Sequence, residues 1–198
     1  TALLIQNLRF IYNSTIASAK INGKAATVNN TNKTISITLD QEETAYPILE
    51  VVGQVSDQEQ VMTWGEEKLV GDNMVRTGTL RNYGEDHSYT DYAVTVTRPA
   101  VTIATLKSVK WGSETVTFVN NKYELEKLAP IVAMPATVTI EPNSVHQDVA
   151  VSHRNDSVII VVTPEKGEAQ TYVICYKESA TTDATISLRS EERRVGKE

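Results

Sequence analysis

The sequence nearly repeats itself at an interval the size of one small domain. Similar alternating segments begin at Ala17, at Ala104 and at Ala184, so the successive intervals are 87 and 80 residues. The two complete blocks also end alike, in the segments 92–96 and 172–176. A repeat of this length is a folding unit in itself, because the coils of a solenoid are shorter and need neighbours to fold. We therefore expect two small domains in succession.

The composition is that of an ordered globular protein and disfavours several functional classes. Of the 198 residues, 40% are hydrophobic and 22% are charged, which argues against disorder. The formal net charge of −6 disfavours binding to nucleic acid or to an anionic membrane face. Cys175 is the single cysteine, so no disulfide forms within the chain. No segment has the ~18 consecutive apolar residues of a membrane-spanning helix, so we expect no membrane insertion in this sequence.

Alternation of apolar and polar residues with a period of two runs through both blocks and predicts β-strands. It is clearest in the segments 35–39, 92–97, 116–118, 138–140 and 149–152. Threonine and serine take many of the outward positions, as on a pleated surface that is half solvated. One apolar face per strand needs a second sheet to cover it, which predicts a sandwich.

Residues that favour turns lie between these segments. Asn22-Gly23 follows the opening strand of the first block, and Trp111-Gly112-Ser113 follows that of the second. Asn120-Asn121 and the segment 165–168 mark two further turns, since Asn and Gly adopt positive φ at low cost. Short strands with turns every roughly 8 to 12 residues are typical of immunoglobulin-like folds. The predicted class is therefore all-β, with tandem immunoglobulin-like antiparallel β-sandwich modules.

The same pattern gives the expected boundaries. Residues 1–12 are interpreted as the last strand of a preceding module, 13–98 as a first module and 99–179 as a second. Residues 180–198 are interpreted as the truncated start of a third module, with a charged, non-native tail from about 189; a native basic tail is the alternative. The joint Arg98-Pro99-Ala100 is short and contains proline, so we expect neighbouring modules to sit semi-rigidly end to end.

A series of packing and turn positions in the second block is characteristic. It comprises Ala104, Leu106, Ser108, Val109, Phe118, Tyr123, Ala129-Pro130, Val132, the segment 163–167, Tyr172 and Ile174. This series resembles the bacterial cadherin-like β-sandwich family, an immunoglobulin-like repeat of surface and secreted proteins. The first block fits that family less well. The resemblance implies a fold and says little about a ligand; modules of this family are commonly spacers or accessory domains beside carbohydrate-active enzymes, glycan-binding domains or adhesins.

We expect no catalytic residue, no metal site and no cofactor. The three histidines, His87, His146 and His153, fall in predicted loops without ligand spacing and are interpreted as solvated. The carboxylate runs at 40–43, 66–67 and 85–86 are interpreted as turn and rim charges. Calcium needs six to eight oxygen ligands, and the joint at 98–100 offers no carboxylate.

Glycan binding is the sharper alternative to a purely structural role. Aromatic faces stack on the C–H surfaces of sugars, and a module needs one or two exposed rings beside polar groups. Trp64, beside Gly65, is interpreted as flanking a turn, and Trp111 is expected to cap the core. The candidate ligand-binding residues are Trp64, Asp72, Asn73, Arg76, Tyr83 and Tyr89.

These observations favour a non-catalytic tandem β-sandwich scaffold or spacer in a secreted or cell-surface bacterial protein, with the periplasm as an alternative location. Its expected partners are neighbouring domains of the same polypeptide. The alternative is a carbohydrate-binding accessory module of a polysaccharide-utilising protein.

Overall fold

The computed structural model describes residues 14–55, 58–84, 87–125, 138–154 and 156–176. All regular secondary structure in these ranges is β-strand, so the predicted all-β class is confirmed. None of the described residues forms a helix long and apolar enough to cross a membrane. The expected strand of a preceding module at 1–12 and the expected third module at 180–198 lie outside the described residues.

The N-terminal group of strands forms one continuously paired sheet. Its strands are β1 (Ile16–Ile21), β2 (Lys24–Asn29), β3 (Thr34–Thr38), β4 (Leu49–Gly53), β5 (Gln60–Val70), β6 (Asn73–Tyr83) and β7 (Tyr89–Pro99). The order across the sheet is β4-β1-β2-β3-β7-β6-β5. Strands β3 and β7 pair in parallel and the other neighbours pair antiparallel.

This sheet folds over on itself to enclose a core. In a flat sheet β1 and β7, three positions apart, would be separated by about 14 Å. Nevertheless Ile16 and Ile21 of β1 belong to one buried cluster with Tyr92 and Val94 of β7, all 0% exposed. Period-two alternation explains the cluster, because every second side chain of β7 from Tyr92 onward points to the buried face.

The C-terminal group has two sheets. Its strands are β8 (Leu106–Trp111), β9 (Glu114–Thr115), β10 (Lys122–Leu125), β11 (Val138–Pro142), β12 (Asp148–His153), β13 (Ser157–Thr163) and β14 (Gln170–Tyr176). One sheet has the order β10-β14-β13-β12 and the other β11-β8-β9. Val109 of β8 is buried in one cluster with Val158, Ile160 and Val162 of β13, so the two sheets face each other across a common core.

The turns form where asparagine and glycine predict them. Asn22 and Gly23 join β1 to β2 with φ of 51° and 75°. Asn120 and Asn121 precede β10 with φ of 49° and 61°. One turn prediction is wrong: Trp64 does not flank a turn but lies within β5, and Gly65 sits at a shift in the β5–β6 register.

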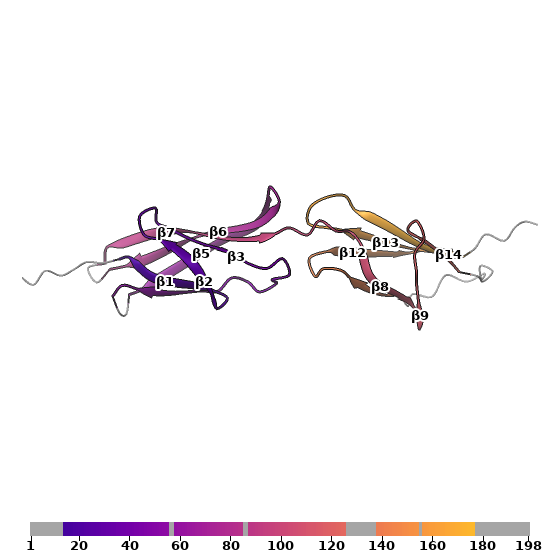
Figure 1. Ribbon diagram of the computed structural model, residues 1–198, viewed down its shortest axis with the longest axis horizontal. Coiled ribbons are helices and arrows are strands. Elements are labelled where there is room, and N and C mark those ends of the chain that lie inside the picture. The colour runs from indigo at the N-terminus through magenta and orange to yellow at the C-terminus, as the bar shows by residue number, and fades with distance from the viewer. Residues whose placement is uncertain (1–13, 56–57, 85–86, 126–137, 155, 177–198) are drawn as a thin grey trace, which may run out of the picture.

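The two core clusters have no residue in common. The chain passes from the N-terminal group to the C-terminal group directly after β7, and the groups lie end to end (Figure 1). The finer description of tandem immunoglobulin-like modules stays a prediction, as do the boundaries at 13–98 and 99–179. The segment between β7 and β8, together with the loops that contact it, forms the junction between the groups.

Candidate functional site: the junction around Arg98

Arg98 is a charged side chain at the end of an apolar strand face. It follows Tyr92, Val94 and Val96 at every second position of β7, and like them it is buried, with 5% of its surface exposed. A buried charge is costly unless it is paired and hydrogen-bonded. A stable arrangement of Arg98 at this position therefore requires acidic side chains as partners.

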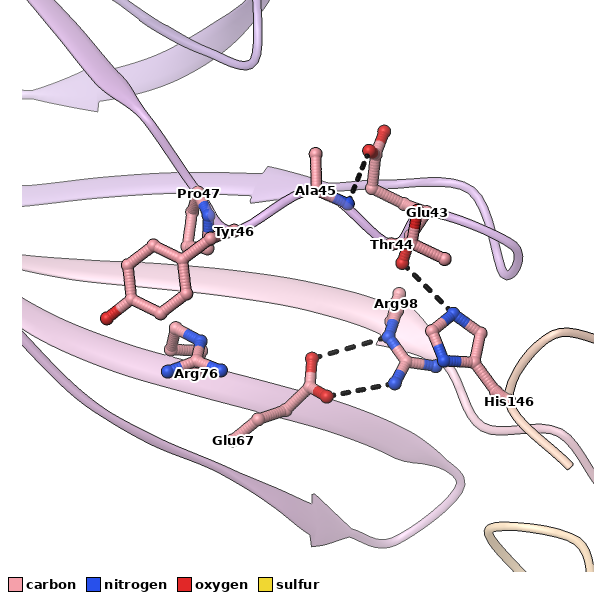
Figure 2. A pocket seen from close by; sticks show the side chains of 9 residues that line it. All are labelled: Glu43, Thr44, Ala45, Tyr46, Pro47, Glu67, Arg76, Arg98 and His146. Atoms are coloured by element: carbon pink, nitrogen blue, oxygen red, sulfur yellow. Dashed lines mark hydrogen bonds and ion pairs between the residues drawn. The ribbon is translucent and has the colours of Figure 1, made fainter. Parts of the chain in front are cut away.

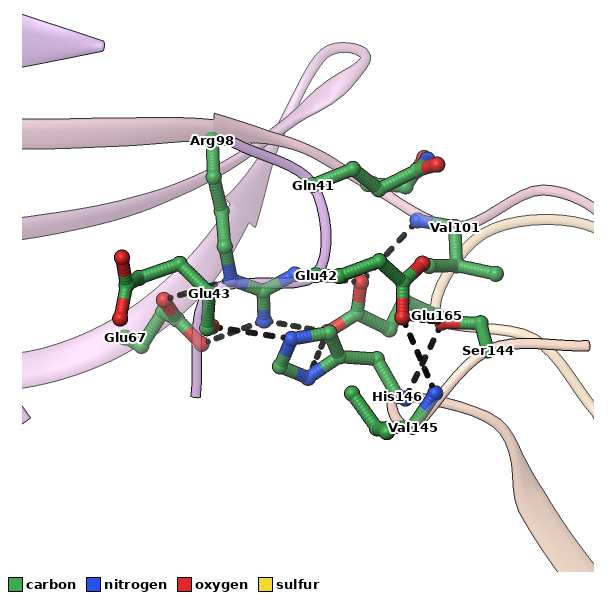
Figure 3. A network of polar contacts seen from close by, with 11 residues as sticks. Gln41, Glu42, Glu43, Glu67, Arg98, Val101, Ser144, Val145, His146 and Glu165 are labelled. Atoms are coloured by element: carbon green, nitrogen blue, oxygen red, sulfur yellow. Dashed lines mark hydrogen bonds and ion pairs between the residues drawn. The ribbon is translucent and has the colours of Figure 1, made fainter. Parts of the chain in front are cut away.

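Two carboxylates supply that pairing from opposite sides of the junction. Glu67 of β5 accepts from Arg98 Nε at 3.3 Å and from Nη2 at 2.9 Å. Glu165, in the loop between β13 and β14, accepts from Nη1 at 2.8 Å and from Nη2 at 2.5 Å. Figure 3 shows the guanidinium lying between the two carboxylates. One cation thus joins an acid of each strand group.

Several hydrogen-bond donors stabilise the ionised carboxylate of Glu165. Its Oε2 also accepts from the backbone N–H of Val101 at 3.0 Å. Burial works to raise the pKa of Glu165, but the hydrogen bonds from Arg98 and Val101 outweigh it and hold this pKa below its ordinary value. The hydrogen bond to Glu165 raises the pKa of Arg98 further. The pair is therefore fully ionised at neutral pH.

A second set of contacts joins the loop after β3 to the loop between β11 and β12. The carboxylate of Glu42 accepts from Ser144 Oγ at 2.9 Å and from the Val145 N–H at 3.1 Å. His146 Nε2 lies 3.0 Å from the carbonyl oxygen of Glu43. The Nδ1 atom of His146 lies 3.8 Å from Glu165 Oε1. The contacts of Glu42 and Glu43 again pair residues of one strand group with residues of the other, whereas the contact between His146 and Glu165 lies within the C-terminal group.

A third set of contacts involves the tip of the β5–β6 hairpin. Lys166 Nζ forms an ion pair with Asp72 and donates to the carbonyl of Gly71 at 3.0 Å. The Lys166 N–H donates to the Val101 carbonyl at 3.0 Å, and the Ala100 N–H donates to the Asp72 carbonyl at 3.0 Å. Three segments of the N-terminal group, namely the end of β7, the loop after β3 and the tip of the β5–β6 hairpin, thus contact two loops of the C-terminal group.

A small pocket of about 130 Å³ opens beside this network (Figure 2). Tyr46 stands at its side with 58% of its surface exposed, and the guanidinium of Arg76 lies 4.6 Å from the centre of its ring. The lining residues are Glu43, Thr44, Ala45, Tyr46, Pro47, Glu67, Arg76, Arg98 and His146. A volume of this size accommodates several water molecules or one small molecule about the size of benzene.

The six candidate ligand-binding residues are not brought together. Asp72 directly precedes β6, and Asn73 and Arg76 lie at the junction end of that strand, whereas Tyr83 lies at its other end. Arg76 and Tyr83 are seven residues apart in an extended strand, a distance of about 23 Å. Tyr83 and Tyr89 form an edge-to-face pair at 5.9 Å.

Trp64 and two of these polar candidates already have protein partners. The Trp64 ring is half-buried and packs against the N-terminal core cluster. Asp72 pairs with Lys166, and Arg76 Nη1 donates to the Gly65 carbonyl at 2.7 Å. Their observed contacts are those of packing and of the junction.

Three interpretations of titratable residues need correction. His146 is not solvated, because its side chain is only 16% exposed and both ring nitrogens face oxygen atoms. His153 lies in β12 and not in a loop, although it is exposed. The run at 40–43 is more than rim charge, since Glu42 bonds across the junction. The sequence signals for this network are the joint itself and the alternation of β7, which puts Arg98 on the buried face; the partners of Arg98 lie far along the chain.

Metal binding and known relatives give no further guide. Within the described ranges, no group of three or more His, Cys, Asp or Glu side chains is arranged to hold a metal ion. No model of a known protein family matches the chain, and no curated protein matches it.

Proposed function

We propose that this chain is a non-catalytic scaffold of a secreted or cell-surface bacterial protein, which holds a functional domain at a set distance and orientation. The work of such a segment is mechanical. It requires a folded unit on each side of a joint and a joint that does not bend freely.

The observation that supports this proposal most directly is the position of Arg98. Four hydrogen bonds join its guanidinium to Glu67 of the N-terminal group and to Glu165 of the C-terminal group. Bidentate pairing of arginine with carboxylate fixes geometry as well as distance. A flexible linker between independent domains has no need of such a buried, oriented cation.

Residual dipolar couplings of the backbone amides test the proposal on the full chain. They give one alignment tensor for β1–β7 and one for β8–β14. If the junction is stiff, the two tensors have the same magnitude and orientation. In Arg98→Met, and independently in Glu165→Gln, the bridging ion pair is broken. We therefore expect the magnitude of the smaller alignment tensor to fall relative to that of the larger one.

Arg81→Met is the matched control. Arg81 makes a bidentate pair with Asp91 at 2.8 and 2.9 Å within the N-terminal group, away from the junction. Its loss should leave the ratio of the tensors unchanged. Tensors of clearly different magnitude in the unmodified chain would show independent motion of the two groups and overturn the proposal.

A further inference from the structure

Strand β12 forms an edge of the sheet β10-β14-β13-β12, so among the described residues it pairs on one side only. A sheet edge presents unpaired backbone N–H and C=O groups, and proteins usually block it with a bulge, a lysine, a proline or a very short strand. None of these features occurs in β12. Its register with β13 is regular from Asp148 to His153, and the residues between these two ends are uncharged.

The other edge strands in the described ranges carry such blocking features. The ladders of β5 and β11 each contain a register shift. Strand β9 has two residues only, and exposed charges lie on β10 at Lys122 and on β4 at Glu50. Of these edges, β12 is therefore the one best suited to pair with a further strand.

The backbone groups of alternate residues in β12 point to its free side. At the end of the β12–β13 hairpin the Arg154 N–H donates to the Ser157 carbonyl at 2.8 Å. Because hydrogen-bonded pairs alternate along an antiparallel ladder, Ser152 and Ala150 also bond to β13. The residues whose N–H and C=O groups face away from the sheet are therefore Val149, Val151 and His153.

Two opposite charges lie on one face of this strand. Asp148 and Arg154 are six residues apart, so period-two alternation puts their side chains on the same side of the sheet. Both are exposed, and neither side chain has a hydrogen bond or an ion pair among the described residues. They flank Val151 at three residues on either side, and Val151 itself is 41% exposed.

This arrangement of charges is complementary to itself. When two copies of β12 lie antiparallel with their Val151 residues opposite each other, Asp148 of each copy faces Arg154 of the other. The outward N–H and C=O groups of Val149 meet those of His153 in the same register. A pairing centred on Ala150 would place Asp148 opposite a serine and lose both ion pairs. Since opposite charges across neighbouring strands stabilise a sheet, the charges select the register centred on Val151.

We propose that β12 is a self-association surface: two copies of this chain pair antiparallel through β12, about a two-fold axis at Val151. Such a contact is isologous, because each copy contributes the same strand. The ladder hydrogen bonds supply affinity, and the two Asp148–Arg154 pairs fix the register. The contact joins two scaffold segments side by side and does not depend on the stiffness of the junction around Arg98.

Sedimentation equilibrium of the full chain, from about 10 μM to about 1 mM, measures this association. We expect a reversible dimer. Asp148→Arg places like charges opposite each other at both ends of the contact, and so does Arg154→Asp. Each change should weaken dimerisation by about tenfold or more. The double variant Asp148→Arg/Arg154→Asp restores both pairs with their signs exchanged and should regain the original affinity.

Glu114→Arg is the matched control for net charge. It changes the charge by the same amount as Asp148→Arg, but Glu114 is an exposed residue of β9, in the other sheet. Its replacement should leave dimerisation unchanged. If Glu114→Arg weakened dimerisation as much as Asp148→Arg does, the effect would be one of overall charge, and the proposed pairing would be refuted.

Amide hydrogen exchange across the same concentrations identifies the edge that is used. The N–H of Val151 should gain protection as the dimer forms, whereas the N–H groups of Ala150 and Ser152, bonded to β13, serve as internal references. Retained protection of these two in every variant shows that a loss of association does not come from unfolding.

Three results would overturn the proposal. One is a chain that stays monomeric up to about 1 mM. Another is a dimer in which the Val151 N–H gains no protection, since that dimer uses a different surface. The third is a double variant that associates no better than Asp148→Arg alone, because the charges would then not face each other.

Discussion

Arg98 and Glu165 form a bidentate ion pair across the junction, with Nη1–Oε2 at 2.8 Å and Nη2–Oε1 at 2.5 Å, although they are 67 residues apart in sequence. The arginine ends an apolar strand face, and the acid belongs to a loop of the next strand group. The pair therefore connects the stability of β7 to the placement of the β13–β14 loop. Several consequences of this connection are measurable.

Removal of the Arg98 guanidinium should destabilise the folded protein. Arg98→Met leaves Glu67 and Glu165 as uncompensated, partly buried acids beside each other, and we expect the free energy of unfolding to fall by about 2–4 kcal/mol. Urea denaturation followed by circular dichroism measures the loss. The exposed Arg81–Asp91 pair is the control, since Arg81→Met should lower the free energy of unfolding much less. Equal losses in the two variants would contradict a special role for Arg98.

A fall in pH should destabilise the folded protein partly through protonation of Glu165. Because its pKa is lower in the folded protein than the ordinary value of 4.5, its stabilising contribution is present above about that pH and is lost as the pH falls through the folded pKa. The urea midpoint between neutral pH and about pH 3 should therefore fall less steeply in Glu165→Gln than in the unmodified chain.

Glu168→Gln is the control for this acid dependence. Glu168 lies in the same loop, is exposed, and has no hydrogen bond or ion pair among the described residues. Its replacement should leave the slope unchanged. A slope in Glu165→Gln identical to that of the unmodified chain would show that the Arg98 pair contributes nothing to acid sensitivity.

The sequence predicts the strands of this protein better than it predicts the junction. Strand alternation and Asn-Gly turns are local signals, and Ile35, Tyr92 and Val94 lie buried as their period-two pattern requires. The same alternation continued to Arg98 puts a charge on the buried face. Its partner Glu165 cannot be deduced that way, because the pairing depends on how the two strand groups meet.

The glycan candidates show the limit of reasoning from residue type. The dipeptide Trp64-Gly65 predicts a turn, but a glycine also suits a strand at a register shift, which is where Gly65 lies. That difference turns Trp64 from a candidate binding residue into a half-buried packing residue. His146 was missed for the opposite reason, since its loop position suggests solvation and only the tertiary contact with Glu43 and Glu165 buries it.

The end of β1 should depend on one buried tyrosine hydroxyl. Tyr92 is 0% exposed and donates to Asn30 Oδ1, and the Asn30 amide in turn donates to the Ile16 carbonyl at 2.8 Å. Tyr92→Phe removes one bond of this buried set and should lower the free energy of unfolding by about 1–2 kcal/mol. Tyr89→Phe, on an exposed ring, should change it by less than about 0.5 kcal/mol. Chemical denaturation of both variants measures these two changes in the free energy of unfolding; equal changes would contradict the prediction.

Affinity electrophoresis against a panel of polysaccharides tests the carbohydrate-binding alternative. We expect the full chain to migrate freely, because Arg76 and Tyr83 lie about 23 Å apart along β6 and Trp64 packs against the core. Trp64→Ala should instead lower the free energy of unfolding by about 1–3 kcal/mol through lost packing. Retardation by a polysaccharide that disappears in Trp64→Ala, with the fold retained, would establish binding and contradict this prediction.

The two core clusters should unfold as separate units, and each contains its own fluorescent reporter. Trp64 packs against the N-terminal cluster and Trp111 against the C-terminal cluster. Ile160, 0% exposed in the second cluster, loses about 2–4 kcal/mol of packing when changed to Ala. In a Trp64→Phe background this change should shift the Trp111 transition to lower urea. In a Trp111→Phe background it should leave the Trp64 transition nearly unchanged, because no core residue belongs to both clusters.

Ile35 is buried in the first cluster. Ile35→Ala should therefore shift the Trp64 transition to lower urea and leave the Trp111 transition nearly unchanged. Equal shifts of both reporters would mean that the junction merges the two groups into one cooperative unit, and the division into modules would then be wrong.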